Sequence, residues 1–387
     1  MSTSTAEFAR SVVDAFRVLD GFSATQIVRA GPIQVTADVR FRRPNLCALE
    51  IQSYRSPLLE LEERIANGAE FSEEELTGLS ITYDGRVSLL FDPRTSVGIE
   101  KPSRFVAEPL PGVQAFAEIG FLDALTHDFL IRDAGEETID DRPARLLGLK
   151  PKHFYRSYLL KTTAFPIRRA VVAFDVDTLF PRRIQFFPAE NTLLFSLVGS
   201  DPVTILYRQV RLETPDTTAF SASPMAGSRL FRESALAGDE LVKVLPFPFS
   251  LEPFLQAGFH LLNDSSTLLL DEEGERGYCT LILRSEGEEA DPPALTLRVG
   301  NYLSRNMSRR KKTLAETGEV VQIGDSVGRV LDRSGQWSRN VSAASARTLT
   351  EVSWTHDELF WFLTADGLDE EQLIALATEI AKGQATS

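Results

Sequence analysis

The chain has 387 residues, of which 55 are acidic and 41 are basic, so its net charge at pH 7 is −14. A phosphate backbone would repel so acidic a chain, which argues against a general nucleic-acid-binding function and against docking on an anionic membrane through bulk charge. The length exceeds one ordinary domain, and a hydrophobic content of 43% is enough for two separate cores. No apolar run approaches the roughly 20 residues that span a bilayer.

The first fifty residues predict a helix followed by antiparallel strands. Ser4 and Glu7 have the spacing of a capping box. Apolar residues then recur at helical intervals, at Phe8, Val12, Phe16 and Leu19. We expect this helix to cover one face of a sheet. Residues 34–42 alternate strictly between apolar and polar, as in a half-buried strand, and residues 47–51 continue the alternation in a second strand.

Two local signals define the geometry next to these strands. Pro44 fixes its own φ and restricts the residue before it, so Arg43 is presented at a defined strand end. The Asp84-Gly85 pair suits the left-handed angles of a two-residue hairpin turn between strands at 79–83 and 87–91. An acidic segment at 56–76 separates these two parts and carries helical signals.

The middle of the chain reads as one continuing antiparallel sheet. Strand-like runs follow at 144–149, 169–174, 183–187, 192–197 and 203–212. Several of them are apolar on both faces. Leaving five or six Phe- or Leu-sized side chains exposed would cost on the order of 10 kcal/mol, which is comparable to the stability of a whole domain. Helices, among them the Phe-rich segment 113–125, a bound lipid, or both must therefore cover that face.

Composition divides the chain into a first domain at 1–224, a linker at 225–240 and a smaller α+β domain at 241–387. The linker is placed where Ser, Ala, Gly and Pro dominate and periodicity is weak. The last part holds seven strand-like runs and ends in an amphipathic helix after Gly367. The expected fold class is α+β and mostly β, with a curved antiparallel sheet, or incomplete barrel, covered by helices.

Signals for catalysis or cofactor binding are absent from the sequence. The four histidines are isolated from one another, and no GxSxG elbow, phosphate-binding loop or dinucleotide fingerprint follows a strand. We therefore expect a protein that is not an enzyme and has no metal or other cofactor. Cys47 and Cys279 both lie in strand-like alternations, which favours two buried thiols over a disulfide.

One basic run, Arg309 to Lys312, stands out in this acidic chain. Its polar surroundings between strands favour a solvated hairpin tip. The alternative is a site for an anionic lipid head group or an acidic partner protein.

The order of several short motifs resembles the LolA/LolB family of bacterial lipoprotein carriers over roughly residues 5–224. The motifs are the 43–46 Arg-Pro-Asn-Leu run, Tyr83-Asp84-Gly85 leading into Leu90 to Pro93, the 150–152 Lys-Pro-Lys strand end, the 179–184 hairpin and the 220–224 closing segment. A carrier-like domain followed by a small α/β domain is also the layout of RseB/MucB-type regulators, which bind a membrane anti-sigma factor.

This resemblance implies an apolar cavity that takes acyl chains and an arginine, here Arg43, that bonds to a lid and holds the empty cavity closed. The alternative for Arg43 is a solvated strand end. The expected function is a non-catalytic carrier for lipoprotein acyl chains or another elongated apolar ligand; the alternative is a regulatory module that binds a protein partner, such as an anti-sigma factor. The residues implied to line the ligand site are Arg43, Val39, Phe41, Leu49, Phe91, Phe116, Phe121, Leu122, Leu125, Phe174 and Phe195.

The resemblance also implies an extracytoplasmic location, in the periplasm or cell envelope. The N-terminal residues show no signal-peptide pattern, so a cytoplasmic location stays open. The smaller domain is expected to contact a membrane or a regulatory protein, and no nucleic-acid partner is expected.

Overall fold

The computed structural model describes residues 4–31, 33–43, 46–55, 77–101, 125–126, 129–152, 167–188, 201–221, 227–235, 238–262, 266–285, 293–303, 305–332 and 349–385. The chain forms two compact units. Unit 1 comprises residues 1–60, 71–97 and 102–226, and unit 2 comprises residues 61–70, 98–101 and 227–387. Among the described helices, none combines the length and the hydropathy that crossing a bilayer requires.

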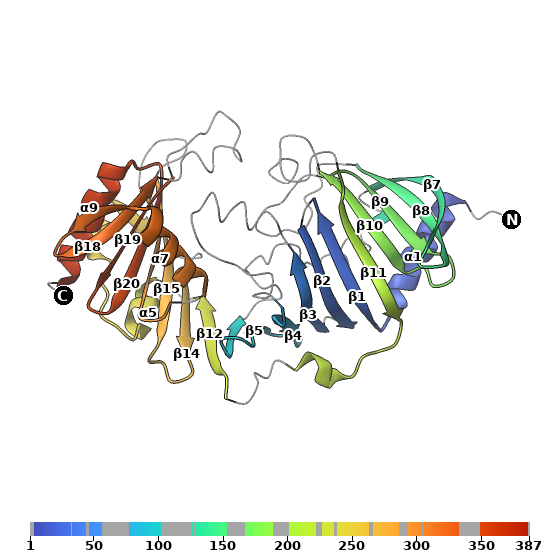
Figure 1. The fold of residues 1–387 in the computed structure, drawn as a ribbon, viewed down its shortest axis with the longest axis horizontal. Coiled ribbons are helices and arrows are strands. Elements are labelled where there is room, and N and C mark those ends of the chain that lie inside the picture. The colour runs from blue at the N-terminus through green and yellow to red at the C-terminus, as the bar shows by residue number, and fades with distance from the viewer. Residues whose placement is uncertain are drawn as a thin grey trace. The chain divides into compact units, whose positions relative to one another are not determined.

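Unit 1 is a curved antiparallel sheet with a long helix against it, which confirms the expected fold class (Figure 1). Across the described residues the sheet stays open, with strand order β7-β8-β9-β10-β11-β1-β2-β3-β4-β5. Its strands are β1 Gly21–Ala30, β2 Ile33–Arg42, β3 Leu46–Arg55, β4 Ser80–Tyr83, β5 Ser88–Asp92, β7 Phe129–Ile139, β8 Arg142–Pro151, β9 Ile167–Asp175, β10 Pro181–Pro188 and β11 Val203–Arg211.

The helix of unit 1, α1 Thr5–Val18, begins at the capping box that the sequence predicts. The Ser4 hydroxyl accepts a hydrogen bond from the Glu7 amide at 3.2 Å, and the Ser4 amide donates to the Glu7 carboxylate at 3.0 Å. These bonds satisfy helix N–H groups that would otherwise lack partners. One face of α1 is buried, through Phe8, Ala9, Val12, Val13 and Phe16.

The hairpin at Asp84 turns one residue later than the sequence predicts. Tyr83 is registered opposite Ser88, and the Asp84 N–H donates to the Val87 carbonyl at 3.3 Å, so the two turn residues are Gly85 and Arg86. The Asp84 carboxylate explains the difference, because it accepts the backbone N–H groups of Arg86 and Val87, both at 2.9 Å. The shifted register turns Leu90 to the face shared by Ile81, and it turns Phe91 to the other face, opposite Ser80.

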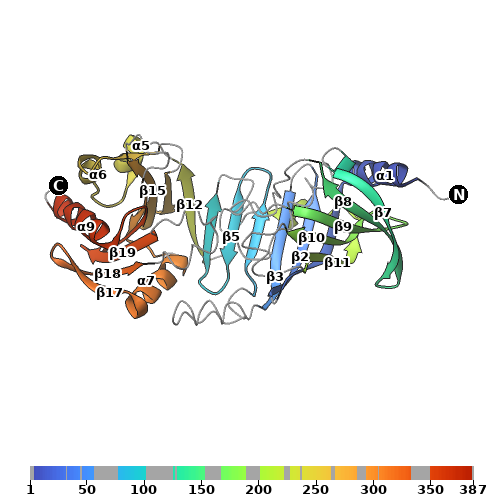
Figure 2. The ribbon, with the colours of Figure 1, turned by 90° about the horizontal axis from the view of Figure 1, so that it is seen from above.

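Unit 2 is a second antiparallel sheet with helices on both faces (Figure 2). From one side to the other its strands follow the order β12-β14-β15-β16-β20-β19-β18-β17, with β13 also paired to β15, and β6 paired to β12. The strands are β6 Val97–Lys101, β12 Arg229–Ala235, β13 Phe259–Leu261, β14 Thr267–Asp271, β15 Gly277–Ser285, β16 Ala294–Gly300, β17 Glu319–Ile323, β18 Ser326–Asp332, β19 Leu349–His356 and β20 Leu359–Asp366.

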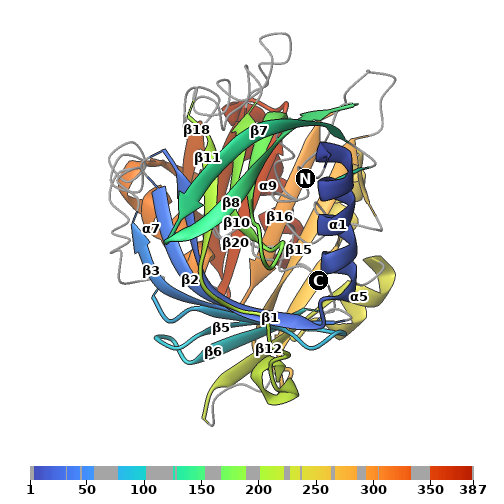
Figure 3. The same ribbon diagram turned by 90° about the vertical axis from the view of Figure 1, so that its right-hand side faces the viewer.

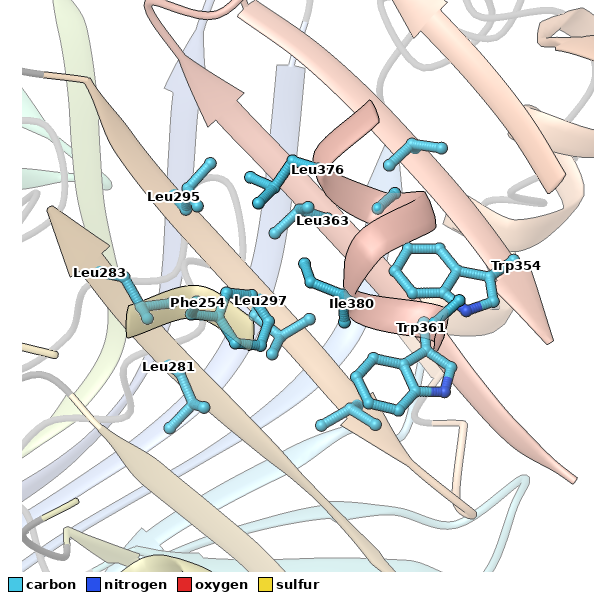
Figure 4. Packing of buried hydrophobic residues seen from close by; sticks show 14 of the residues in the cluster. Phe254, Leu281, Leu283, Leu295, Leu297, Trp354, Trp361, Leu363, Leu376 and Ile380 are labelled. Atoms are coloured by element: carbon cyan, nitrogen blue, oxygen red, sulfur yellow. The ribbon is translucent and has the colours of Figure 1, made fainter. Parts of the chain in front are cut away.

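The larger core of unit 2 lies under the C-terminal helix α9 Glu370–Ala385, which was expected from the apolar stripe of that segment. Trp354 and Trp361 are registered opposite each other and stack with ring centroids 5.4 Å apart (Figure 4). Phe249 stacks on Trp361 in turn, at 6.0 Å. The short helices α5 Gly238–Val244 and α6 Glu252–Gln256 complete this unit, and α6 contacts α9.

One expectation for this half of the chain is wrong, and a second segment is more structured than its composition suggests. The basic run at 309–312 lies in a helix, α7 Arg305–Thr317, and not at a hairpin tip. Met307 and Leu314, two turns apart, are buried against Phe360 and Phe362 of β20, and this stripe makes the segment helical. The stretch expected as a linker contains β12, because Phe231 is fully buried and gives that strand a core contact.

The two cysteines are buried thiols and not a disulfide, as expected from their positions in alternating segments. Cys47 lies on β3 and Cys279 on β15. Burial raises the pKa of the Cys279 thiol to about 12, so this thiol stays protonated and unreactive at neutral pH.

A buried ion pair holds the β9–β10 turn of unit 1. Asp175 is 1% exposed and accepts hydrogen bonds from Nε and Nη2 of Arg182, at 3.1 and 2.8 Å. It also accepts the backbone N–H groups of Asp177 and Thr178. Burial alone would raise the pKa of Asp175, but the bonds from Thr178 and Arg182 outweigh it and leave the pKa below its ordinary value of 3.8.

We predict that Asp175→Asn lowers the free energy of unfolding by about 3 kcal/mol, because Arg182 is left buried and unpaired. A lowered folded-state pKa means that this stabilisation is present above pH 3.8 and is lost as the pH falls through the folded-state value. Urea unfolding between pH 3 and 7 should therefore show a flatter acid dependence in the variant. The exposed neighbour Asp177→Asn is the control; equal losses in both variants would contradict the prediction.

Candidate functional site

The face of the unit 1 sheet against which α1 packs is its inner face, and it is apolar across its whole width. One row of residues in register crosses five strands: Ala24, Val39, Leu49, Ile81 and Leu90. All five are buried, each with 7% of its surface exposed or less. The alternation of β2 and β3 places the polar partners, such as Asp38 and Glu50, on the opposite outer face.

A second row crosses the strands from β3 to β8, toward the end of the sheet where α1 packs. It contains Leu147, Val172, Ile184, Ile205, Val28, Val35 and Tyr54 in register from β8 to β3. These residues are also buried. The inner face is therefore a continuous hydrocarbon surface, and its curvature is visible in Figure 3.

A buried polar pair interrupts this surface between β1 and β11. Gln26 and Tyr207 are registered opposite each other on β1 and β11, and the Gln26 amide donates to the Tyr207 hydroxyl at 3.1 Å. The two residues are 1% and 3% exposed. Phe22 and Phe180 pack edge-on against the Tyr207 ring. The bond between the pair lowers the cost of burying an amide and a phenol among aromatic rings.

Helix α1 packs on the β7–β9 end of the inner face (Figure 3). Phe8 meets Phe174 of β9 edge to face, with ring centroids 6.3 Å apart. The Arg145 guanidinium also lies over the Phe8 ring, 4.8 Å from its centroid. The same guanidinium pairs with the Asp133 carboxylate at 2.6 Å. The Thr5 hydroxyl donates to the same Asp133 carboxylate at 3.4 Å. The hydrogen bond from Arg145 holds the pKa of Asp133 below its ordinary value.

Arg43 holds the other end of α1. Its Nε donates to the carbonyl of Leu19 at 2.8 Å, and its Nη2 donates to the carbonyl of Phe16. Its guanidinium also lies 5.5 Å from the Phe16 ring centroid. These carbonyls belong to the last turn of α1, where the helix presents unpaired acceptors and partial negative charge. A rigid guanidinium fork can satisfy both at once.

Four of the residues predicted to line the site share the inner face. Val39, Phe41 and Leu49 lie together on β2 and β3, and Phe174 lies under α1 on β9. Arg43 directly follows β2, and among the described residues its guanidinium bonds to carbonyls at the end of α1. Phe91 is on the outer face because of the shifted turn after Asp84. Leu125 is buried; Phe116, Phe121, Leu122 and Phe195 lie outside the described residues.

Sequence reasoning missed the residues that β1 and β7 contribute, because neither strand was predicted. Gln26 is the one polar residue at an inner-face position of β1, between Ala24 and Val28. That break in an apolar alternation was the available signal. Asp133 and Arg145 had no signal, since their pairing depends on the bulge between Asp133 and Gly135 in the β7–β8 register.

The chemistry available at the inner face is burial of apolar surface, with the Gln26 amide, the Tyr54 and Tyr207 phenols and, beside α1, the Asp133–Arg145 ion pair. Within the described residues, no three His, Cys, Asp or Glu side chains gather as a metal site would require. The face can exclude water and contact hydrocarbon.

We predict that Arg43→Leu frees the C-terminal end of α1, because two charge-assisted hydrogen bonds are lost. A loss of about 2 kcal/mol corresponds to about thirtyfold faster amide exchange in the last turns of α1. Hydrogen exchange with mass spectrometry measures this. The matched control is Arg42→Leu, whose side chain donates to the Pro215 carbonyl instead; unchanged exchange in α1 of the Arg43 variant would contradict the role of Arg43.

No protein-family model matches the chain, and the search of curated proteins finds no match. Solved structures with similar folds include the MucA/MucB complex of Pseudomonas aeruginosa, with 11% identity, a TM-score of 0.33, and coverage of 97% of this chain and 97% of that chain. A LolA superfamily protein from Nitrosomonas europaea matches 57% of this chain and 98% of its own, with 13% identity and a TM-score of 0.27. Lipoprotein LppX from Mycobacterium tuberculosis matches 55% of this chain and 100% of its own, with 14% identity and a TM-score of 0.32.

The two groups named in the sequence resemblance are thus also found among the solved structures with similar folds. At these TM-scores the matched coordinates diverge widely from this chain, so we base the functional proposals on its own side chains.

Proposed function

We propose that the chain is a non-catalytic binding protein whose inner face takes an acyl chain or another elongated apolar ligand. The observation that carries this proposal is the way α1 closes the β7–β9 end of that face. The helix contributes hydrocarbon to the contact, while polar groups at its two ends, Thr5 with Asp133 and the Phe16 carbonyl with Arg43, hold it in place. Such end contacts can open without unfolding the sheet beneath.

The energies of opening and binding are of similar size. Moving α1 aside exposes Phe8, Val12, Val13 and Phe16, at about 2 kcal/mol each, so opening costs about 8 kcal/mol in apolar exposure. An acyl chain of about 14 methylenes gains about 11 kcal/mol on burial, at about 0.8 kcal/mol each. A ligand of that length offsets the opening, whereas a short apolar molecule does not. The proposed specificity is therefore for long hydrocarbon.

A second candidate function is a regulatory module that binds a protein partner while its own side chains fill the inner face. The observation favouring it is the deep burial of the central inner-face residues by the chain's own atoms. Val39 and Leu49 are each 2% exposed and Ile51 is 0% exposed. In this case α1 would stay closed throughout the binding cycle.

The same proposal gives each unit a role and gives the protein a cellular location. Unit 1 would be the ligand-binding domain and unit 2 an accessory domain that contacts a membrane or regulatory protein. The motif resemblance in the first half of the chain supports an extracytoplasmic location, in a bacterial envelope. The buried, unreactive Cys279 thiol is compatible with an oxidising compartment.

Native mass spectrometry of the purified chain separates the two candidates. A carrier of acyl chains should show an additional mass that is lost on collisional activation and that is identified as lipid after extraction. A regulator whose inner face is filled by its own residues should show the bare mass, before and after incubation with phospholipid vesicles. Turnover of an ester or glycoside substrate would contradict both.

We predict that Arg43→Leu changes lipid retention, because α1 is released at one end, while the protein stays folded and its melting temperature falls by only a few degrees. Retention is measured as bound lipid per folded molecule in the same mass spectra, and melting by circular dichroism. Arg42→Leu is again the control and should retain lipid as the wild type does. If Arg43→Leu unfolds the protein and leaves retention per folded molecule unchanged, Arg43 is only structural.

A further inference from the structure

The edge strand β17 of unit 2 has open main-chain groups. Within the described residues its one registered partner is β18, and the two are joined by a two-residue turn at Gly324-Asp325. The pair Ile323 and Ser326 closes that turn and is a hydrogen-bonded pair. Along an antiparallel ladder, hydrogen-bonded and non-hydrogen-bonded pairs alternate, so the pairs of Gln322 and Val320 are not hydrogen-bonded to β18. The N–H and C=O groups of Val320 and Gln322 therefore point away from β18, to the free side.

Exposed valines lie next to these groups. Val320 is 62% exposed and Val327 is 66% exposed. The register pairs Val320 with Arg329 and Gln322 with Val327, so both valines lie on the same face of the hairpin. Natural edge strands are often protected by charged residues, above all Lys, by Pro or by a bulge. β17 has no Lys, Pro or bulge, and its one charged residue is Glu319 at its start.

This face is also the basic side of an acidic chain. Helix α7 packs on it, through Met307 and Leu314 and their contact with Leu331 of β18 (Figure 2). The basic run at 309–312 belongs to α7, and its members Lys311 and Lys312 are exposed. Lys312 lies 4.0 Å from the Glu316 carboxylate on the same helix, yet α7 carries more basic than acidic residues around this pair. Arg329, directly opposite Val320, adds another cation, held by its bond to the Gly318 carbonyl at 3.0 Å.

We propose that β17 and α7 together form a docking surface for an extended acidic segment of a partner protein, which adds to the sheet as a further strand. The main-chain groups of Val320 and Gln322 would bond to the segment, as in other cases of strand addition. Apolar side chains of the segment cover Val320 and Val327, and its carboxylates face the cations of α7. This surface is separate from the inner face of unit 1, so it does not depend on the function proposed there.

Charge decides between an acidic partner and a second copy of this chain. Edge-to-edge pairing of two copies is isologous, so each α7 would meet the same basic surface in its mate. The two chains also each carry a net charge of −14. Both the local and the overall charges then repel. A separate acidic segment meets the local basic surface with complementary charge.

A synthetic peptide tests this surface directly. The probe is Glu-Glu-Val-Thr-Val-Thr-Val-Glu-Glu with a fluorescent label, titrated with the full chain and followed by anisotropy at low salt. Two analogues isolate the two parts of the recognition: one replaces every Glu by Lys, and one carries N-methyl groups on alternate residues, which removes the ladder donors. We expect the acidic peptide to bind at least tenfold more tightly than either analogue.

Val320→Lys should weaken binding of the acidic peptide at least tenfold, because a lysine on the edge disfavours strand addition. Val244→Lys on α5, which is 48% exposed in the wild type, is the matched control and should bind as the wild type does. Circular dichroism confirms that both variants fold. Lipid retention should be the same in both, so failure here is distinguishable from failure of the carrier function.

Three results would overturn the proposal. The first is equal binding of the N-methylated or the Lys-containing analogue, and the second is equal affinity of Val320→Lys and Val244→Lys. The third is absence of peptide binding together with a concentration-dependent dimer in sedimentation that Val320→Lys abolishes. In that last case the occupant of the edge is a second copy of the chain.

Discussion

Unit 1 depends on one constraint: along β1, β2 and β3, successive side chains point alternately to the inner and the outer face of the sheet. Every second residue of these strands faces the same way, and the pairing keeps Ala24, Val39 and Leu49 in one row. A one-residue slip in any strand would turn its whole apolar set toward water and bring Asp38 or Glu50 inside. The bulge between Thr36 and Ala37 lets β3 change phase once, so that Tyr54 still faces inward beside Val35. Curvature, helix packing and the inner face all follow from this register.

Much of the fold could be predicted because it follows short-range rules. The capping box at Ser4 and Glu7 is satisfied in the structure. The strand at 34–42 and all seven strand-like runs of the second half also form strands. The failures share a different origin. The Asp84 side chain moves the turn one residue along the chain, to Gly85-Arg86. Two buried residues, Met307 and Leu314, make a helix of the basic run. At β12 the local composition indicated a linker, whereas the strand depends on a few apolar contacts such as that of the buried Phe231.

The candidate site was predictable in its hydrocarbon part and not in its polar part. Val39, Phe41 and Leu49 follow from alternation, since a half-buried strand must place them together. Arg43 could be placed at a strand end, but its partners could not, because the Phe16 and Leu19 carbonyls are 27 and 24 residues away in sequence. The contact of Arg145 with both Asp133 and Phe8 joins three separate elements. Long-range contacts of this kind leave no periodic trace in a sequence.

The indole stack under α9 makes the two units spectroscopically distinct. All three tryptophans of the chain belong to unit 2, and the stacked pair Trp354 and Trp361 is 4% and 2% exposed. Indole emission therefore reports on the packing of unit 2 alone, while unit 1 contributes phenol emission from residues such as Tyr83 and Tyr207. A denaturation experiment that excites indole selectively would follow the unfolding of one half of this molecule without any label. Comparison with far-ultraviolet circular dichroism of the whole chain would then reveal whether the halves melt together or in sequence.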